Sequence, residues 1–231
     1  MPVECIVLAG GPGTRLRGVI GETPKCMALV AGKPFLHHLF DYLEAQACTK
    51  AILSLGYKHE LVEAWLEKAD WNFEIETVVE TEALGTGGGI QLALTKASAA
   101  NVFVINGDTL FCADLAAMAL FHAAKNSGTT LALKNLQQFD RYGVVCCAED
   151  GSILSFEEKK PVADGLINGG IYLLNKAFFE QKRLPQRHSF EKDYLEAFVA
   201  EQQFYGYRSS AYFIDIGIPA DYEQAQKDLA G

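Results

Sequence analysis

A glycine-rich segment near the start of the 231-residue sequence has the residue types that hold phosphate. It reads LAGGPGTRL, from Leu8 to Leu16, and three of its residues are glycine. Glycines let the backbone approach a ligand closely and adopt positive φ, so that successive N–H groups can converge on phosphate oxygens. Arg15 adds a guanidinium, which binds phosphate through two parallel hydrogen bonds. The segment therefore predicts a phosphate site, and a turn that needs its glycines for geometry alone is the alternative.

Two widespread phosphate motifs do not fit this segment. Counted from Gly11, the dinucleotide pattern G-x-G-x-x-G requires a final glycine where this sequence has Leu16. The P-loop requires Gly-Lys followed by Ser or Thr, but the pair Gly32-Lys33 is followed by Pro34. A nicotinamide-dependent oxidoreductase is therefore disfavoured.

Two aspartates that end apolar runs are candidates for holding a metal ion. Asp108 follows an apolar run through Asn106 and Gly107, and Asp215 follows the apolar residues 212–214. If the fold brings these carboxylates together, they can hold Mg²⁺ against phosphate oxygens, because Mg²⁺ prefers oxygen ligands. A single aspartate at the end of a strand more often serves a turn or a cap, so the prediction depends on the pair.

The overall charge excludes one class of partner. The sequence has 20 Lys and Arg against 29 Asp and Glu, a formal net charge of −9. Proteins that neutralise many nucleic acid phosphates carry the opposite sign, so we expect no nucleic acid partner. No stretch reaches the ~18 apolar residues of a membrane span, and the start lacks the basic region of a signal peptide. We therefore expect a cytoplasmic protein with no membrane partner, whose six cysteines are reduced thiols.

The elements that must position these side chains are indicated by hydrophobic periodicity. Apolar runs predict strands at residues 4–9, 51–55, 73–79 and 101–106, and amphipathic stretches predict helices at 34–47, 59–68, 87–96 and 115–126. Shorter extended pieces at 130–133, 144–147, 153–158 and 171–174 indicate antiparallel strands. Helices are also predicted at 190–202, capped by Ser189, and at 219–229, where Pro219 suits a first turn.

This alternation predicts an α/β fold with a Rossmann-like, doubly wound, mixed and mostly parallel central sheet. No repeat or Pro/Ser-rich linker separates the two halves, so we expect a single domain over residues 1–231.

Several further motifs resemble those of one family. They are Pro24-Lys25, Gly32-Lys33-Pro34, Leu84-Gly85-Thr86-Gly87-Gly88, Asn106-Gly107-Asp108, Tyr142-Gly143-Val144-Val145, Phe156-x-Glu158-Lys159, Asn168-Gly169-Gly170 and Asp215-Ile216-Gly217. With the phosphate segment, and in the same order over nearly the whole chain, they resemble the nucleotidyltransferases that join a nucleoside triphosphate to a sugar 1-phosphate. The resemblance implies a GT-A-like fold with a smaller sugar-binding lobe, pyrophosphate as a product and Mg²⁺ as the cofactor.

The resemblance also implies roles for the matching residues. Arg15, Lys25 and Asp108 would be catalytic, and Asp108 and Asp215 would bind the metal. The nucleotide would contact Leu8, Ala9, Gly10, Gly11, Gly13, Thr14, Arg15, Lys25, Glu80, Gly85, Thr86 and Asp108. The sugar phosphate would contact Asn106, Gly143, Glu158, Lys159, Asn168 and Gly169.

The sequence departs from the family pattern at two places. Cys26 stands where relatives commonly have proline after the lysine, and we expect this exchange to loosen the loop. Lys160 separates Lys159 from Pro161, whereas proline often follows that lysine at once.

Glu80 indicates the base of the nucleotide. Related uridylyltransferases have glutamine four residues before the Leu-Gly-Thr-Gly segment, where it pairs with uracil. A carboxylate only accepts hydrogen bonds, so it mismatches a uracil carbonyl, whereas guanine presents N1–H and N2–H₂ side by side as donors. We therefore predict GTP. An ordinary acidic surface that also includes Glu74, Glu76 and Glu82 is the alternative.

The identity of the sugar rests on the resemblance. Residues 167–172, 190–195 and 213–219 look most like the family members that use D-glycero-α-D-manno-heptose 1-phosphate, which supply GDP-heptose for bacterial surface polysaccharide. Mannose 1-phosphate is one alternative, and transfer from UTP to an amino-sugar 1-phosphate such as that of muramic acid is another.

A catalytically silent relative that binds sugar nucleotides and regulates a partner is the alternative from another class. The sequence retains Arg15, Lys25, Asp108 and Asp215 together, which favours an enzyme because such residues are kept for chemistry and not for packing. The expected partners are thus GTP and a sugar 1-phosphate, and the sequence leaves a homo-oligomer open.

Overall fold

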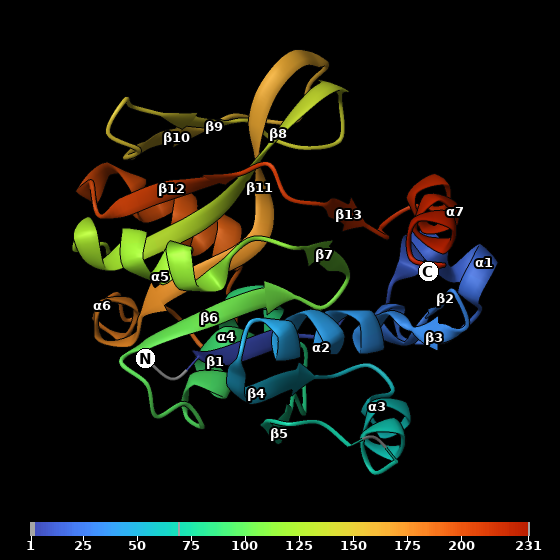
Figure 1. Ribbon diagram of the computed structural model, residues 1–231. Helices are drawn as coiled ribbons and strands as arrows, with labels where there is room; N and C mark the ends of the chain where they lie inside the picture. Colours follow the sequence, from blue (N-terminus) through green and yellow to red (C-terminus); the bar gives the residue numbers. More distant parts are fainter. Residues whose placement is uncertain (1–2, 69, 231) are drawn as a thin grey trace.

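The protein is built around a seven-stranded sheet in the order β12-β8-β11-β6-β1-β4-β5 (Figure 1). The computed structural model describes residues 3–68 and 70–230. The strands of this sheet are β1 (Val3–Leu8), β4 (Cys48–Leu55), β5 (Glu74–Val79), β6 (Asn101–Asn106), β8 (Thr129–Phe139), β11 (Val162–Asn175) and β12 (Phe204–Ser209). Neighbouring strands are parallel except at β11, which runs antiparallel to both β6 and β8. The predicted mixed, mostly parallel sheet is confirmed.

Helices cover both faces of the sheet. Successive residues of β1 point to opposite faces, because Cys5 and Val7 pack into one core and Ile6 into the other, and all three are fully buried. Burial on both faces explains the unbroken apolar runs of the central strands. The first core includes α2 (Phe35–Ala45), α3 (His59–Leu66), α5 (Leu115–Ala124) and α7 (Pro219–Asp228). The second includes α4 (Gly85–Leu94), α6 (Lys176–Glu180) and a π-helical segment, Phe190–Glu196.

The second half of the chain forms the antiparallel strands that were predicted, but two of them are much longer than expected. The apolar pieces 130–133 and 171–174 are the buried parts of β8 and β11, and both strands continue as more exposed, polar stretches. These far ends project from the sheet together with the antiparallel pair β9 (Val145–Cys147) and β10 (Ile153–Phe156) (Figure 1). The projecting part corresponds to the smaller lobe that the resemblance implied.

The segment predicted as a helix over residues 190–202 is helical with an unusual geometry. Ser189 caps it as predicted, because its Oγ accepts a hydrogen bond from the backbone N–H of Lys192 at 3.2 Å. The first turns are π-helical, and the segment ends in a 3₁₀ turn, Val199–Glu201. A π-helix is wider than an α-helix and often lies at a functional site. The spacing of apolar residues does not distinguish the two kinds of helix.

Several short strands were not predicted as strands, although an apolar run over residues 212–214 was noted before Asp215. They are the antiparallel pairs β2 (Leu29–Val30) with β3 (Lys33–Pro34) and β7 (Thr109–Phe111) with β13 (Phe213–Asp215). Pro219 opens α7 as predicted. Within the described part of the chain, no helix combines the length and the apolar character needed to span a bilayer.

Candidate active site

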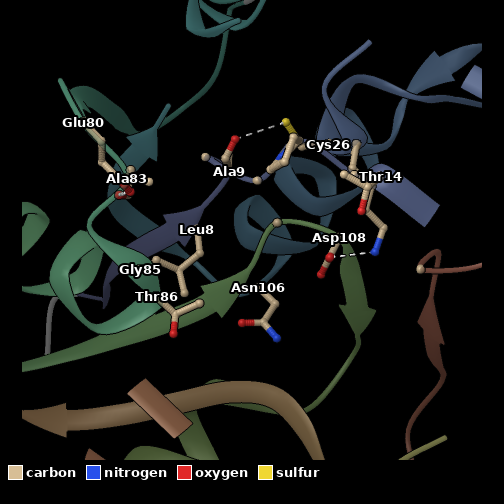
Figure 2. Close-up of a pocket in the computed structure, with 18 of the residues that line it drawn as sticks. Leu8, Ala9, Thr14, Cys26, Glu80, Ala83, Gly85, Thr86, Asn106 and Asp108 are labelled. Atoms are coloured by element: carbon tan, nitrogen blue, oxygen red, sulfur yellow. Dashed lines mark hydrogen bonds and ion pairs between the residues drawn. The ribbon is translucent and has the colours of Figure 1, made fainter. Parts of the chain in front are cut away.

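A cavity of about 470 Å³ opens at the carboxyl ends of β1, β4, β5 and β6, the edge at which open α/β sheets bind ligands. We call it the first cavity. All the residues predicted to contact the nucleotide line it, from Leu8 through Asp108. Figure 2 shows Glu80 and Ala83 on one side, Cys26 and Asp108 on the other, and Leu8 between them. The structure therefore brings the predicted nucleotide residues together at one site.

A second cavity of about 530 Å³ adjoins the first. It lies between the sheet and the smaller lobe, and all the residues predicted to contact the sugar phosphate line it. The residues that line both cavities are Arg15, Lys25, Asn106, Asp108, Glu191 and Gly217. Two ligands bound in these cavities would meet at the two cations and the carboxylate of Asp108.

The loop after β1 is shaped around Lys25. Gly13 has a φ of +61°, and a Cβ on it would lie 2.9 Å from the Cβ of Lys25, so the left-handed turn and the lysine backbone pack directly together. The loop continues through a 3₁₀ turn, Thr14–Leu16, a short helix α1 (Arg17–Ile20) and a second 3₁₀ turn, Lys25–Met27. Leu16 is fully buried and anchors the loop, whereas Arg15 is exposed and faces the cavities.

Lys25 lies between the two candidate metal ligands. Its Nζ is 2.7 Å from Oδ2 of Asp108 and 3.5 Å from Oδ1 of Asp215. The pairing of β7 with β13 places Thr109 opposite Asp215, and the N–H of Ile216 donates to the carbonyl of Asp108 at 3.1 Å. Strand pairing thus joins two aspartates that are far apart in the sequence.

The environment of Asp215 opposes its ionisation. Burial raises the pKa of Asp215, the negative charge of Asp108 raises it further, and Lys25 acts in the opposite direction. The Asp215 carboxylate also accepts hydrogen bonds from the N–H of Gly217 at 2.7 Å and from the hydroxyl of Tyr142 at 3.4 Å. These donors hold the side chain in place beside Lys25.

The two carboxylates fit a divalent cation that arrives with phosphate. Among the described residues, no group of three or more His, Cys, Asp or Glu side chains gathers into a complete metal site. Mg²⁺ needs few protein ligands, because it usually keeps several waters and takes substrate phosphates beside one or two carboxylates. Asp108, which lines both cavities, and Asp215, which lines the second, provide such a pair of oxygen donors.

Cys26 is packed rather than reactive. Its side chain is buried, with Sγ 3.9 Å from the carbonyl oxygen of Ala9 (Figure 2). Burial, and next the charge of Asp108, raise the pKa of the Cys26 thiol to about 12. The thiol therefore fills space beneath the loop as a small apolar group.

Glu80 stands at the end of β5 on the wall of the first cavity. Its Oε2 accepts the N–H of Leu84 at 2.9 Å, and its Oε1 is 3.4 Å from the hydroxyl of Ser54. Gly89 lies against it, since a Cβ there would come within 2.8 Å of Oε1. The carboxylate is held firmly, and Oε1 has one long hydrogen bond and spare acceptor capacity. That it reads guanine stays a prediction.

The glycines at the start of α4 make room for residues 186–191, which we call the strap. A Cβ on Gly85 would lie 2.6 Å from the carbonyl oxygen of His188, and one on Gly88 would lie 2.3 Å from that of Gln186. The N–H of His188 donates to Leu84 at 3.0 Å, and the N–H of Gly87 donates to His188 at 3.1 Å. Gly85 was predicted to contact the nucleotide. Its packing against the strap was not predicted, although the cluster of glycines was a signal for it.

Several side chains that line the second cavity had no predicted role, namely Arg141, Tyr142, Tyr172, Glu191 and Lys192. Arg141 pairs with Asp221 in the first turn of α7 and so ties the cavity wall to that helix. Tyr172 is fully buried, and its hydroxyl accepts a hydrogen bond from Nδ2 of Asn168 at 2.8 Å. Lys160, the residue that departs from the family pattern, pairs with Glu157 at 2.7 Å and leaves Lys159 to line the cavity.

The chain belongs to the nucleotidyl transferase family, whose model matches residues 4–231. It is 48% identical over 227 residues to the D-glycero-alpha-D-manno-heptose 1-phosphate guanylyltransferase of Aneurinibacillus thermoaerophilus, with 98% of each chain covered. It is 40% identical over 220 residues to the protein of the same name from Campylobacter jejuni, covering 95% of this chain and 97% of the relative. The crystal structure of HddC from Yersinia pseudotuberculosis complexed with GMP-PN has a TM-score of 0.87 and 36% identity, covering 98% and 99% of the two chains.

The packing of the strap on α4 gives a first prediction. Gly88→Ala should lower the free energy of unfolding by about 1–3 kcal/mol, because the new methyl group must displace the backbone of Gln186. Gly18→Ala is the matched control, since nothing lies within 4 Å of that Cβ and the residue is in α1. It should be neutral or stabilising by up to ~1 kcal/mol. Urea unfolding followed by circular dichroism measures both, and a Gly88→Ala variant as stable as the unmodified protein would contradict the steric argument.

Proposed function

We propose that the protein transfers GMP from GTP to D-glycero-α-D-manno-heptose 1-phosphate, giving GDP-heptose and pyrophosphate. The observation that carries the proposal is the pair of adjoining cavities that share Arg15, Lys25 and Asp108. The full-length similarity to two proteins named for this reaction supports the choice of substrates.

In this reaction a phosphate oxygen of the sugar 1-phosphate bonds to the α-phosphorus of GTP. The bond from that phosphorus to the oxygen bridging the α- and β-phosphates breaks, and pyrophosphate leaves. No covalent intermediate with the protein is needed, so the protein contributes position and charge. GTP occupies the first cavity and the sugar phosphate the second, which brings the two reacting groups together beside Lys25 and Arg15.

Cations carry much of this work. Arg15 contacts the triphosphate through its guanidinium, and Lys25 stabilises the negative charge that develops on the phosphates. Lys25 lies beside Asp108 and Asp215 and lines both cavities, so its ammonium group is close to phosphates bound in either one. Lys159 approaches the sugar phosphate from the lobe side of the second cavity.

Asp108 and Asp215 are the residues that would hold Mg²⁺. When bound, the ion supplies neutralisation of phosphate charge and orientation of the phosphate oxygens. The carboxylates are available to it when Lys25 turns toward the phosphates instead.

Guanine recognition falls to Glu80. The residue lies on the side of the first cavity opposite Asp108, so a nucleotide whose phosphates reach Asp108 places its base near Glu80 (Figure 2). A carboxylate accepts N1–H and N2–H₂ of guanine together, and the spare acceptor capacity of Oε1 permits this. The sugar is held by Asn106, Gly143, Glu158, Asn168 and Gly169 in the second cavity.

The direct test is a panel of substrates. We expect pyrophosphate release with GTP and the manno-configured heptose 1-phosphate in the presence of magnesium, and a product with the mass of GDP-heptose. The value of kcat/KM should be at least ~10-fold lower when GTP is replaced by UTP, CTP, ATP or dTTP. It should fall by a similar factor when the heptose 1-phosphate is replaced by mannose 1-phosphate or an amino-sugar 1-phosphate. In each case the replacement leaves polar groups of the site unmatched. A preference for UTP would overturn the base assignment, and a preference for mannose 1-phosphate would overturn the sugar assignment.

A substitution at Glu80 tests the base assignment by itself. Glu80→Gln replaces one acceptor by a donor, so kcat/KM with GTP should fall ~10-fold or more while that with UTP rises or stays the same. Glu82→Gln is the matched control, because Glu82 is an exposed acid that does not line either cavity. An unchanged ratio of GTP to UTP use in Glu80→Gln would show that Glu80 does not read the base.

The metal assignment has its own test. Asp108→Asn removes one of two anionic ligands, so kcat should fall at least ~10²-fold and binding of Mn²⁺ in the presence of GTP, measured by electron paramagnetic resonance, should weaken. Asp41→Asn changes an exposed aspartate of α2 and should leave both quantities within twofold. Unaltered Mn²⁺ binding in Asp108→Asn would contradict the assignment.

A further inference from the structure

Among residues 3–68 and 70–230, Glu191 is the one residue shared by both cavities that comes from the helical layer on the second face of the sheet. The other shared residues belong to the loop after β1, to the end of β6 or to the turn after β13. Glu191 lies in the first turn of the π-helical segment, whose Lys192, Leu195 and Glu196 line the second cavity alone.

The carboxylate of Glu191 reaches across to the predicted nucleotide loop. The hydroxyl of Thr86 donates to Oε2 of Glu191 at 2.9 Å, and the same hydroxyl oxygen accepts the backbone N–H of Phe190 at 2.9 Å. Ser189 Oγ lies 3.2 Å from the same Oε2. The Thr86 hydroxyl, which lines the first cavity, thus makes two hydrogen bonds to the start of the π-helical segment, and that segment forms a wall of the second cavity.

Backbone contacts make this connection stiff. Two hydrogen bonds join the backbone of residues 84–87 to His188. The glycines of α4 leave no gap between the helix and the strap, since Cβ atoms at Gly87 and Gly88 would overlap His188 and Gln186. A shift of Gly85 and Thr86 on binding a ligand must therefore move the strap and the turn that carries Glu191, because closely packed elements transmit displacement.

Charge argues against a simple electrostatic role for Glu191. It is a half-buried carboxylate at the junction of two cavities that take phosphates, where a negative charge weakens the binding of both ligands. What it provides is an acceptor that fixes Thr86 to the π-helical segment.

We propose that Glu191 is a positioning residue that couples the two cavities through Thr86, so that nucleotide bound in one increases the affinity of the other for the sugar phosphate. The proposal rests on the assignment of the two cavities to the two substrates. Such coupling is reciprocal: the factor by which the nucleotide raises the affinity for the sugar phosphate equals the factor by which the sugar phosphate raises the affinity for the nucleotide.

The experiment measures that factor by calorimetry. It is the ratio of the Kd of the sugar 1-phosphate alone to its Kd in the presence of a saturating non-hydrolysable GTP analogue, with magnesium in both. We expect a factor within the common range of about 5–150 for the unmodified protein, and below about 3 for both Thr86→Val and Glu191→Leu, which break the same hydrogen bond. The double variant should lose no more than either single one, because the two residues act as a pair.

Two conservative variants separate positioning from charge and from folding. Glu191→Gln keeps an acceptor for Thr86 and removes the charge, and Thr86→Ser keeps the hydroxyl, so both should retain the coupling factor within twofold. If Glu191 acted only through its charge, Glu191→Gln would bind both ligands more tightly and Glu191→Leu would match it. Thermal unfolding of each variant identifies any that is not folded at the temperature of the measurement.

Three results would overturn the inference: a factor of 1 in the unmodified protein, a factor in Glu191→Leu equal to that of the unmodified protein, or losses in the two single variants that add in the double variant. Failure of the proposed function is a different result. If the substrate panel selects another nucleotide or sugar phosphate, the same measurement is made with that pair, and the coupling then stands or falls independently.

Discussion

The ammonium group of Lys25 between the carboxylates of Asp108 and Asp215 is the interaction on which the site depends. Burial, and next the negative charge of Asp108, raise the pKa of Asp215, and the neighbouring cation of Lys25 acts in the opposite direction. The three residues come from separate parts of the chain. Lys25 and Asp108 line both cavities, and Asp215 lines the second. The same electrostatic problem recurs in the proposed reaction, where cations must hold two phosphorylated substrates together.

Close backbone packing keeps the two cavities adjacent. The glycines of α4 let the strap lie directly on the helix, and Gly13 lets the loop after β1 lie directly on Lys25. In both places a glycine serves a contact between protein segments as much as a contact with ligand. The site is therefore rigid where the predicted nucleotide loop meets the π-helical segment, and this rigidity is what allows one cavity to influence the other.

Family similarity and site geometry contribute different parts of the proposal. The family is shown by a match over nearly the whole chain, and relatives with 48% and 40% identity are named for one guanylyltransferase reaction. The arrangement of Arg15, Lys25 and Asp108 around the junction explains how such a transfer can proceed without a covalent intermediate. In the proposed function, Glu80 is assigned to the base and the residues of the second cavity to the sugar, and both assignments are predictions.

The sequence by itself determined the central strands and the residues of the loop after β1, because strands buried on both faces must be apolar runs and a close approach to phosphate requires glycine. It also determined the N-cap at Ser189 and the proline in the first turn of α7, Pro219, which are local hydrogen-bonding and φ preferences. Only the tertiary structure decided that Asp215 lies beside Asp108, that the glycines of α4 face the strap and that Glu191 meets Thr86. These are contacts between segments distant in the chain, and they depend on strand pairing and helix packing. A cluster of glycines can indicate that something packs closely on a helix, but it does not identify the segment that does so.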